Sequence, residues 1–344
     1  MTGPVTTLPA TAPLNRTPEG MTYGVLVPHF GEHATRDRIV AGSKRAEELG
    51  FDAVWVRDHL LWKPHGIEGT NRTFIEPLAC LNAIGAVTRR IFLGSAVLIP
   101  LRWPLKLAQD LASMTYLHGD RLIAGLGMGS NHAELAAAGF NREQRKLIFT
   151  EMVQIVRRVW KEDNVSFAGK FFQFEDVTIE PKPRARIPIW YGGTTRASVR
   201  TTVAYCDAWM PGRIPLATLD DRLALLAELE AESGRSITRA VIPLVKVDTD
   251  RKRARANLDI QALAGSSEAS KTWILPPGGF QTIEDVRGII VVGEPDEVVE
   301  QIVEIAERGI DHFVFDLRLQ FDRYEETIEL IAERVLPVLK ANRV

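Results

Sequence analysis

After residue 20 the chain alternates short apolar segments with amphipathic segments of helical length, and this alternation limits the possible fold most strongly. Eight segments have the length and apolar character of buried strands: 23–27, 51–56, 91–98, 121–127, 187–191, 208–210, 240–247 and 312–317. Strands separated by helices pair in parallel through right-handed crossovers. Eight of them predict a (β/α)8 TIM barrel of the α/β class, in one domain.

Helical periodicity fills most of the intervals between these strands. Apolar side chains recur at helical spacing in residues 142–160, for example, which predicts an amphipathic helix. The other predicted helices span residues 35–49, 75–87, 105–117, 198–205 and 219–233. Residues 165–174 instead favour a hairpin, with Gly169 in its turn.

The main competitor of the barrel is a doubly wound open sheet, which usually carries a glycine-rich loop after its first strand. Here the first strand is followed by Pro28, His29 and Phe30, whereas a glycine pair occurs late, at Gly192 and Gly193. Phosphate sites of barrels often lie toward the last strands. We therefore expect a single barrel domain over residues 21–344, preceded by an irregular arm over residues 1–20.

The glycine pair belongs to a sequence that suits anion binding. A buried strand ends at Tyr191, Gly192 and Gly193 let the backbone turn and approach a ligand, and Thr194 and Thr195 precede a helix. Hydroxyl side chains cap helices, and a helix N-terminus favours a phosphate. The alternative is an ordinary turn between a strand and a helix.

The segment from about residue 258 to 289, inserted before the last strand, has no place in the repeat. It contains Gly265 and the sequence Pro276-Pro277-Gly278-Gly279, which favour irregular structure. It also carries apolar side chains, among them Trp273 and Phe280. We expect a lid over the barrel mouth; a surface loop and a dimer contact are the alternatives.

Composition excludes several classes of function. The 344 residues are 45% apolar and 25% charged, with a formal net charge of −2 and no basic block, which does not support nucleic-acid binding. No apolar run approaches the length of a membrane span, and no His/Cys cluster has the spacing of a zinc site. Cys80 and Cys206 are the only cysteines. We expect a cytoplasmic protein without a disulfide framework or a metal site.

Several segments together resemble the bacterial luciferase-like superfamily of flavin- and deazaflavin-dependent oxidoreductases. They are residues 50–60 (GFDAVWVRDHL), 93–100 (LGSAVLIP) with 102–104 (RWP), 119–130 (GDRLIAGLGMGS), 180–183 (EPKP) with 188–193 (PIWYGG), and 293–298 (GEPDEV). Their order and spacing cover about residues 21–340. The resemblance implies an eightfold barrel, a flavin or deazaflavin cofactor, and commonly a homodimer.

Barrel active sites form at the C-terminal ends of the strands, which selects the candidate residues. His59 is the first choice for a proton donor or acceptor, since an imidazole titrates near neutrality and the superfamily has a histidine at the matching position; a histidine merely bonded to Asp58 is the alternative. His29 and Arg102 are the other candidates for catalysis or substrate contact. The expected cofactor-binding residues are Asp58, Ala96, Val97, Met128, Ser130, Asn131, Gly192, Gly193, Thr194 and Thr195.

Within the resemblance, residues 95–97 match a segment that often contains a non-proline cis peptide behind the flavin. The first functional hypothesis is a monooxygenase that uses reduced FMN, supplied by a separate flavin reductase, and O2 to oxygenate a small organic substrate. The alternative is hydride transfer with the deazaflavin coenzyme F420, and a third possibility is a non-catalytic flavin-binding subunit.

Overall fold

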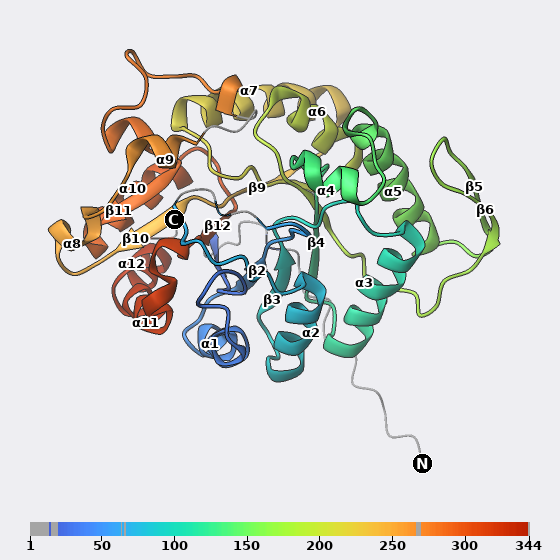
Figure 1. Ribbon diagram of the computed structural model, residues 1–344, viewed down its shortest axis with the longest axis horizontal. Helices are drawn as coiled ribbons and strands as arrows, with labels where there is room; N and C mark the ends of the chain where they lie inside the picture. Colours follow the sequence, from blue (N-terminus) through green and yellow to red (C-terminus); the bar gives the residue numbers. More distant parts are fainter. Residues whose placement is uncertain (1–13, 15–19, 63, 65–66, 266–269, 343–344) are drawn as a thin grey trace.

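Eight parallel strands close into a barrel in the computed structural model, as predicted (Figure 1). The structure describes residues 14, 20–62, 64, 67–265 and 270–342. Around the barrel the strands are β1 (Thr22–Leu26), β12 (His312–Phe315), β9 (Thr238–Val241), β8 (Ala208–Trp209), β7 (Ile189–Tyr191), β4 (Leu122–Leu126), β3 (Phe92–Ser95) and β2 (Ala53–Val56). The arm predicted over residues 1–20 lies, apart from Leu14 and Gly20, outside the described residues.

Helices surround the strands and bury their apolar faces against them (Figure 1). They are α1 (Arg36–Glu48), α2 (Pro77–Val87), α3 (Pro104–His118), α5 (Arg145–Val159), α6 (Arg196–Tyr205), α7 (Leu216–Ser233), α10 (Pro295–Ala306), α11 (Tyr324–Arg334) and α12 (Leu336–Ala341). The six predicted helices are confirmed to within a few residues. The helix predicted to begin at Arg142 starts with a short 3-10 turn, η1 (Arg142–Gln144). The helices α4 (His132–Ala137), α10, α11 and α12 were not predicted. No helix in the described part of the chain is long and apolar enough to cross a membrane.

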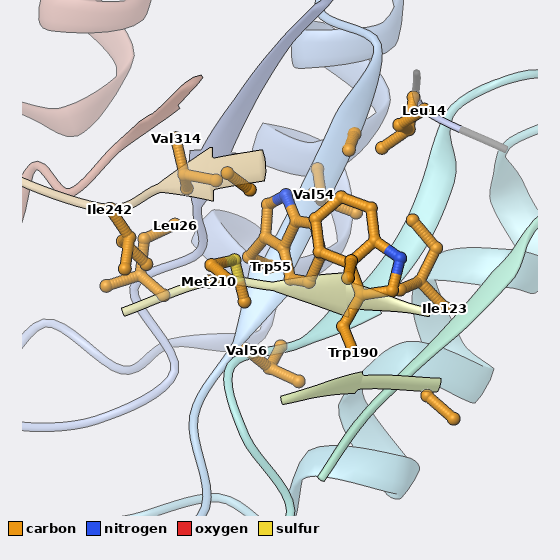
Figure 2. Packing of buried hydrophobic residues seen from close by; sticks show 14 of the residues in the cluster. Leu14, Leu26, Val54, Trp55, Val56, Ile123, Trp190, Met210, Ile242 and Val314 are labelled. Atoms are coloured by element: carbon orange, nitrogen blue, oxygen red, sulfur yellow. The ribbon is translucent and has the colours of Figure 1, made fainter. Parts of the chain in front are cut away.

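Two tryptophans and a histidine fill the inside of the barrel. The rings of Trp55 and Trp190 lie side by side, with centroids 5.1 Å apart (Figure 2). The Trp55 indole N–H donates to Nε2 of His312 at 3.0 Å, and the His312 Nδ1 lies 2.8 Å from the Thr22 hydroxyl. Because Nε2 accepts, Nδ1 carries the proton and the imidazole is neutral. Burial lowers the pKa of His312 to about 3.

The predicted strand over residues 240–247 is wrong as a single strand. Only β9, ending at Val241, belongs to the barrel, whereas β10 (Leu244–Val247) leaves it and pairs in parallel with β11 (Ile290–Gly293). Pro243 lies at the break and has no N–H to donate to a sheet. The two strands therefore form a small sheet beside the barrel.

The inserted segment packs on this small sheet. Around it lie α8 (Arg251–Arg255), α9 (Ile260–Ala264) and two 3-10 turns, η2 (Ser270–Thr272) and η3 (Glu284–Val286). Leu263 and Phe280 belong to a second hydrophobic cluster that also contains Leu244 and Ile290. The insertion thus extends from β10 to β11, and its role as a lid stays a prediction. The predicted hairpin is confirmed as β5 (Val165–Ala168) and β6 (Gln173–Val177), which projects beyond α5 (Figure 1).

Candidate active site

Because all barrel strands are parallel, the loops that follow them gather at one face of the barrel. His29 follows β1, residues 58 and 59 follow β2, residues 96 and 97 follow β3, residues 128–131 follow β4, and residues 192–195 follow β7. The fold therefore brings the residues predicted from sequence to the C-terminal face, where barrel active sites form.

Asp58 and Arg102 form an ion pair that fixes the loop after β3. The Asp58 side chain is only 5% exposed, and its carboxylate accepts from the Arg102 guanidinium at 2.5 Å and from the backbone N–H of Ile99 at 2.9 Å. Arg102 also pairs with Glu76 at 2.6 Å. Burial acts to lower the pKa of Arg102, but the two carboxylates outweigh it and raise that pKa. Both predicted site residues are therefore engaged with protein groups.

The peptide bond between Ala96 and Val97 is cis, as the family resemblance predicted. The Val97 side chain lies over glycines at the ends of two other strands, since a methyl group added at Gly127 or Gly192 would meet it. The half-buried Ala96 and Val97 thus form a closely packed floor at the barrel mouth.

His59 is paired with a buried carboxylate that comes from α4. Its Nδ1 lies 3.1 Å from Oε1 of Glu134, whose side chain is 2% exposed. The same carboxylate accepts from the backbone N–H of Leu61 at 3.0 Å. Burial acts to raise the pKa of Glu134, but these hydrogen bonds outweigh it and lower that pKa. An ionised Glu134 holds the proton of His59 on Nδ1, so Nε2 is the acceptor of the ring, and this atom lies 3.5 Å from Nη2 of Arg57.

Asn131 positions α4 and thereby Glu134. Its side-chain oxygen accepts from the backbone N–H of Ala133 at 3.0 Å and so caps the helix. Met128, which precedes it, is half-buried against the main core, and Ser130 is exposed. The residues predicted after β4 therefore surround a helix N-terminus that faces the loop carrying His59.

His29 has no exposed surface. Its Nε2 accepts from the backbone N–H of Arg57 at 2.8 Å and its Nδ1 lies 3.2 Å from the carbonyl of Ile75, so the proton is on Nδ1. The rings of Phe30 and Phe74 meet it edge-on. Burial lowers the pKa of His29 to about 3. The structure thus places a neutral, fully paired imidazole at this position.

The glycine-rich loop after β7 contains an unsatisfied hydroxyl. Thr195 caps α6 by accepting from the backbone N–H of Ser198 at 3.1 Å. Thr194 is 6% exposed, and its Oγ1 is buried without a hydrogen-bond partner. A buried hydroxyl without a partner is costly, and at a helix N-terminus an anion is the ligand that would satisfy it. Gly193 has φ +144°, a conformation that L side chains rarely adopt.

Comparison with known proteins identifies the family. A family model described as luciferase-like monooxygenase matches residues 15–312. The chain belongs to the luciferase-like monooxygenase family. This chain is similar to the F420-dependent glucose-6-phosphate dehydrogenase of Nakamurella multipartita, with 29% identity over 93% of this chain and 96% of the relative. The F420-dependent glucose-6-phosphate dehydrogenase of Beutenbergia cavernae is 30% identical over 90% of this chain and 95% of the relative.

Solved structures of the luciferase-like fold agree with the barrel. Monooxygenase RslO1 from Streptomyces bottropensis superposes with a TM-score of 0.73 at 24% identity, over 92% of this chain and 99% of that one. An F420-dependent secondary alcohol dehydrogenase in complex with an F420-acetone adduct superposes with a TM-score of 0.72 at 20% identity, over 92% of this chain and 98% of that one. At these identities the likeness concerns the fold alone. The relatives in sequence support an oxidoreductase.

Sequence reasoning missed two features of this luciferase-like site. Glu134 was not selected as a site residue. It lies in the first turn of α4, which follows β4, and the sequence shows an acidic residue soon after that predicted strand. A group of arginines was also missed: Arg57, Arg213 and Arg318 follow β2, β8 and β12. Arg57 directly precedes the predicted Asp58, but nothing in the sequence indicates that the other two approach it.

Proposed function

We propose that this protein is an F420-dependent oxidoreductase that transfers a hydride between the coenzyme and a small organic substrate. The observation that carries the proposal is the sequence similarity to F420-dependent dehydrogenases, 29% and 30% identical over at least 90% of the chain. Among the hypotheses drawn from the sequence, these relatives favour the F420 alternative over reduced FMN.

The residues at the barrel mouth fit a phosphorylated tricyclic cofactor. The orphan hydroxyl of Thr194 and the free N–H groups at the start of α6 suit its phosphate. Ala96 and Val97 would lie against its ring system. Bound F420 supplies a two-electron acceptor for hydride. The protein contributes the position of the substrate and the movement of its proton.

His59 is the group that moves the proton. With Nδ1 bonded to Glu134, Nε2 is the acceptor for the hydroxyl proton of an alcohol that is oxidised to a carbonyl. The carboxylate of Glu134 stabilises the imidazolium that results. Asp58 and Arg102 act more remotely, by holding the loop that carries the floor residues.

An FMN-dependent monooxygenase with a separate flavin reductase is the second candidate, and its support is the description of the family. The paired His59 and Glu134 and the intact glycine-rich loop argue against a non-catalytic flavin-binding subunit. A homodimer is part of the proposal only through the family resemblance.

Anaerobic titration separates the two cofactors. We expect F420 to bind with a dissociation constant well below that of reduced FMN. Binding of F420 is measured by the quenching of its fluorescence. The F420-loaded protein is then mixed with a panel of alcohols, glucose 6-phosphate included, and F420 reduction is recorded. Tight binding of reduced FMN, with O2 consumption and no F420 binding, would overturn the proposal.

A further inference from the structure

Two carbonyl groups of the glycine-rich loop are held by side chains from neighbouring elements. The indole N–H of Trp209, on β8, donates to the carbonyl of Gly193 at 2.9 Å, and Nε of Arg222, on α7, donates to the carbonyl of Thr194 at 3.1 Å. In a trans peptide the N–H points away from the C=O. The N–H groups of Thr194 and Thr195 are thereby turned to the other side of the loop, and among the described residues neither takes part in a backbone hydrogen bond.

Arg222 also bonds to the inserted segment. Its Nη2 donates to the carbonyl of Thr272, in η2, at 2.9 Å. Two residues further on, the backbone N–H of Ile274 donates to the hydroxyl of Thr218, one turn earlier on α7, at 2.8 Å. One guanidinium therefore connects the glycine-rich loop, 28 residues before it in the chain, with the insertion, 50 residues after it.

The guanidinium of Arg222 is fixed in this position. The residue is 4% exposed, and its Nη1 pairs with the carboxylate of Asp221. The other oxygen of Asp221 pairs with Arg196, at the start of α6, at 2.7 Å, and α6 and α7 lie side by side (Figure 1). Because a guanidinium presents its donors in a rigid planar fork, the carboxylate on one side aims the remaining donors at the two carbonyls. All three nitrogens of Arg222 thus donate to protein groups, so this side chain acts through the loop and not on a ligand.

A continuous chain of hydrogen bonds runs from the anion side of the loop to the insertion. The N–H of Thr195 and the C=O of Thr194 belong to the same peptide group, and this C=O accepts from Arg222. Hydrogen bonds in such a chain polarise one another. An anion that accepts from the N–H of Thr195 therefore makes the Thr194 carbonyl a stronger acceptor, which tightens the hold of Arg222 between the loop and Thr272.

Resting on the proposed function for the phosphate of the cofactor, we infer that Arg222 is a positioning residue that couples the glycine-rich loop to residues 270–275. Phosphate bound in the loop strengthens the anchoring of this segment to α7, and the anchored segment in turn favours the loop conformation that binds phosphate. The coupling depends on the phosphate, which F420 and FMN share, and not on the ring system.

Hydrogen exchange of the full chain, followed by mass spectrometry, tests the coupling without a measurement of activity. The cofactor-free protein is compared with protein that holds F420, reduced FMN or inorganic phosphate, under anaerobic conditions. Exchange in residues 270–275 should slow about 5- to 150-fold with the cofactor that binds, the usual size of a coupling between two sites. The internal control is α9, which lies in the same insertion but among the described residues has no hydrogen bond to α7. Its exchange should stay unchanged.

Variants separate coupling from a purely structural role. Arg222→Met should lose the cofactor-dependent slowing, and Arg222→Lys should lose it too, because an ammonium keeps the charge without the fork. Arg196→Met removes the other cation paired with Asp221 and leaves the bridge in place, so it should keep the slowing. A merely structural Arg222 would speed exchange equally with and without cofactor and leave their ratio unchanged.

The parent protein decides the inference even if a variant does not fold. If none of the three probes slows exchange in residues 270–275, or if the slowing persists in Arg222→Met, the inference is overturned. Slowing by reduced FMN but not by F420 would support the coupling and contradict the proposed function, so the two failures are distinguishable.

Discussion

Replacement of Thr194 by valine separates the roles of the two hydroxyls in the glycine-rich loop. The change removes one oxygen and keeps the volume and branching of the side chain. Because Oγ1 of Thr194 is buried without a partner, the cofactor-free protein pays the cost of an unsatisfied hydroxyl, about 1–3 kcal/mol in mutational data. Thr194→Val should therefore leave the free energy of unfolding unchanged or raise it by up to that amount.

The same change should weaken cofactor binding. If Oγ1 donates to the cofactor phosphate, the variant loses a hydrogen bond to a charged group, worth about 1.5–3 kcal/mol. The dissociation constant for F420 should then rise roughly 10- to 150-fold. Urea unfolding of the cofactor-free protein and fluorescence titration with F420 measure the two effects separately.

Thr195→Val is the matched control, because it should show the stability loss that Thr194→Val lacks. The Thr195 hydroxyl caps α6 through the backbone N–H of Ser198, and loss of such a cap costs about 1 kcal/mol of stability. The reasoning is refuted if Thr194→Val lowers stability while F420 affinity stays the same, since its hydroxyl would then serve the protein and not the phosphate.

Further predictions concern the histidines and their partners. His59→Asn should lower kcat about 10²- to 10⁴-fold, the usual value of a general acid–base group, with F420 affinity retained; equal turnover in the variant would remove His59 from the mechanism. Glu134→Gln keeps the shape of the partner and removes its charge, so it should lower kcat less and move the acid limb of the pH–rate profile to lower pH, and an unmoved limb would mean a purely structural role. His29 and His312 have pKa values of about 3 in the folded protein against an ordinary 6.5, so the unfolded chain binds protons first as the pH falls below about 6.5 and stability is lost progressively toward pH 3. At pH 5 each of these two histidines should lower the free energy of unfolding by about 2 kcal/mol. Urea unfolding at pH 7.5 and pH 5 measures this loss, and equal stability at the two pH values would contradict buried neutral imidazoles.

Local patterns were enough to predict the barrel and the cap at the start of α6. Alternating apolar and amphipathic segments specify strands and helices, and parallel pairing of eight strands leaves few topologies. The cap at Thr195 depends on residues no more than three apart, so it is visible in the sequence. The strand over residues 240–247 was predicted wrongly because apolar character continues across Pro243, while the partner of β10, at Ile290–Gly293, is distant in the chain.

The placement of charge was decided only by the tertiary structure. His59 and Glu134 are 75 residues apart. Arg57, Arg213 and Arg318 follow three different strands, so no local spacing indicates that they lie near one another. Burial of His29 likewise depends on rings that the fold packs around it. The sequence by itself determined which elements form and at which face their loops end, because those follow from local periodicity; which side chains pair, and which are left without a partner for a ligand to fill, follows from how the barrel closes.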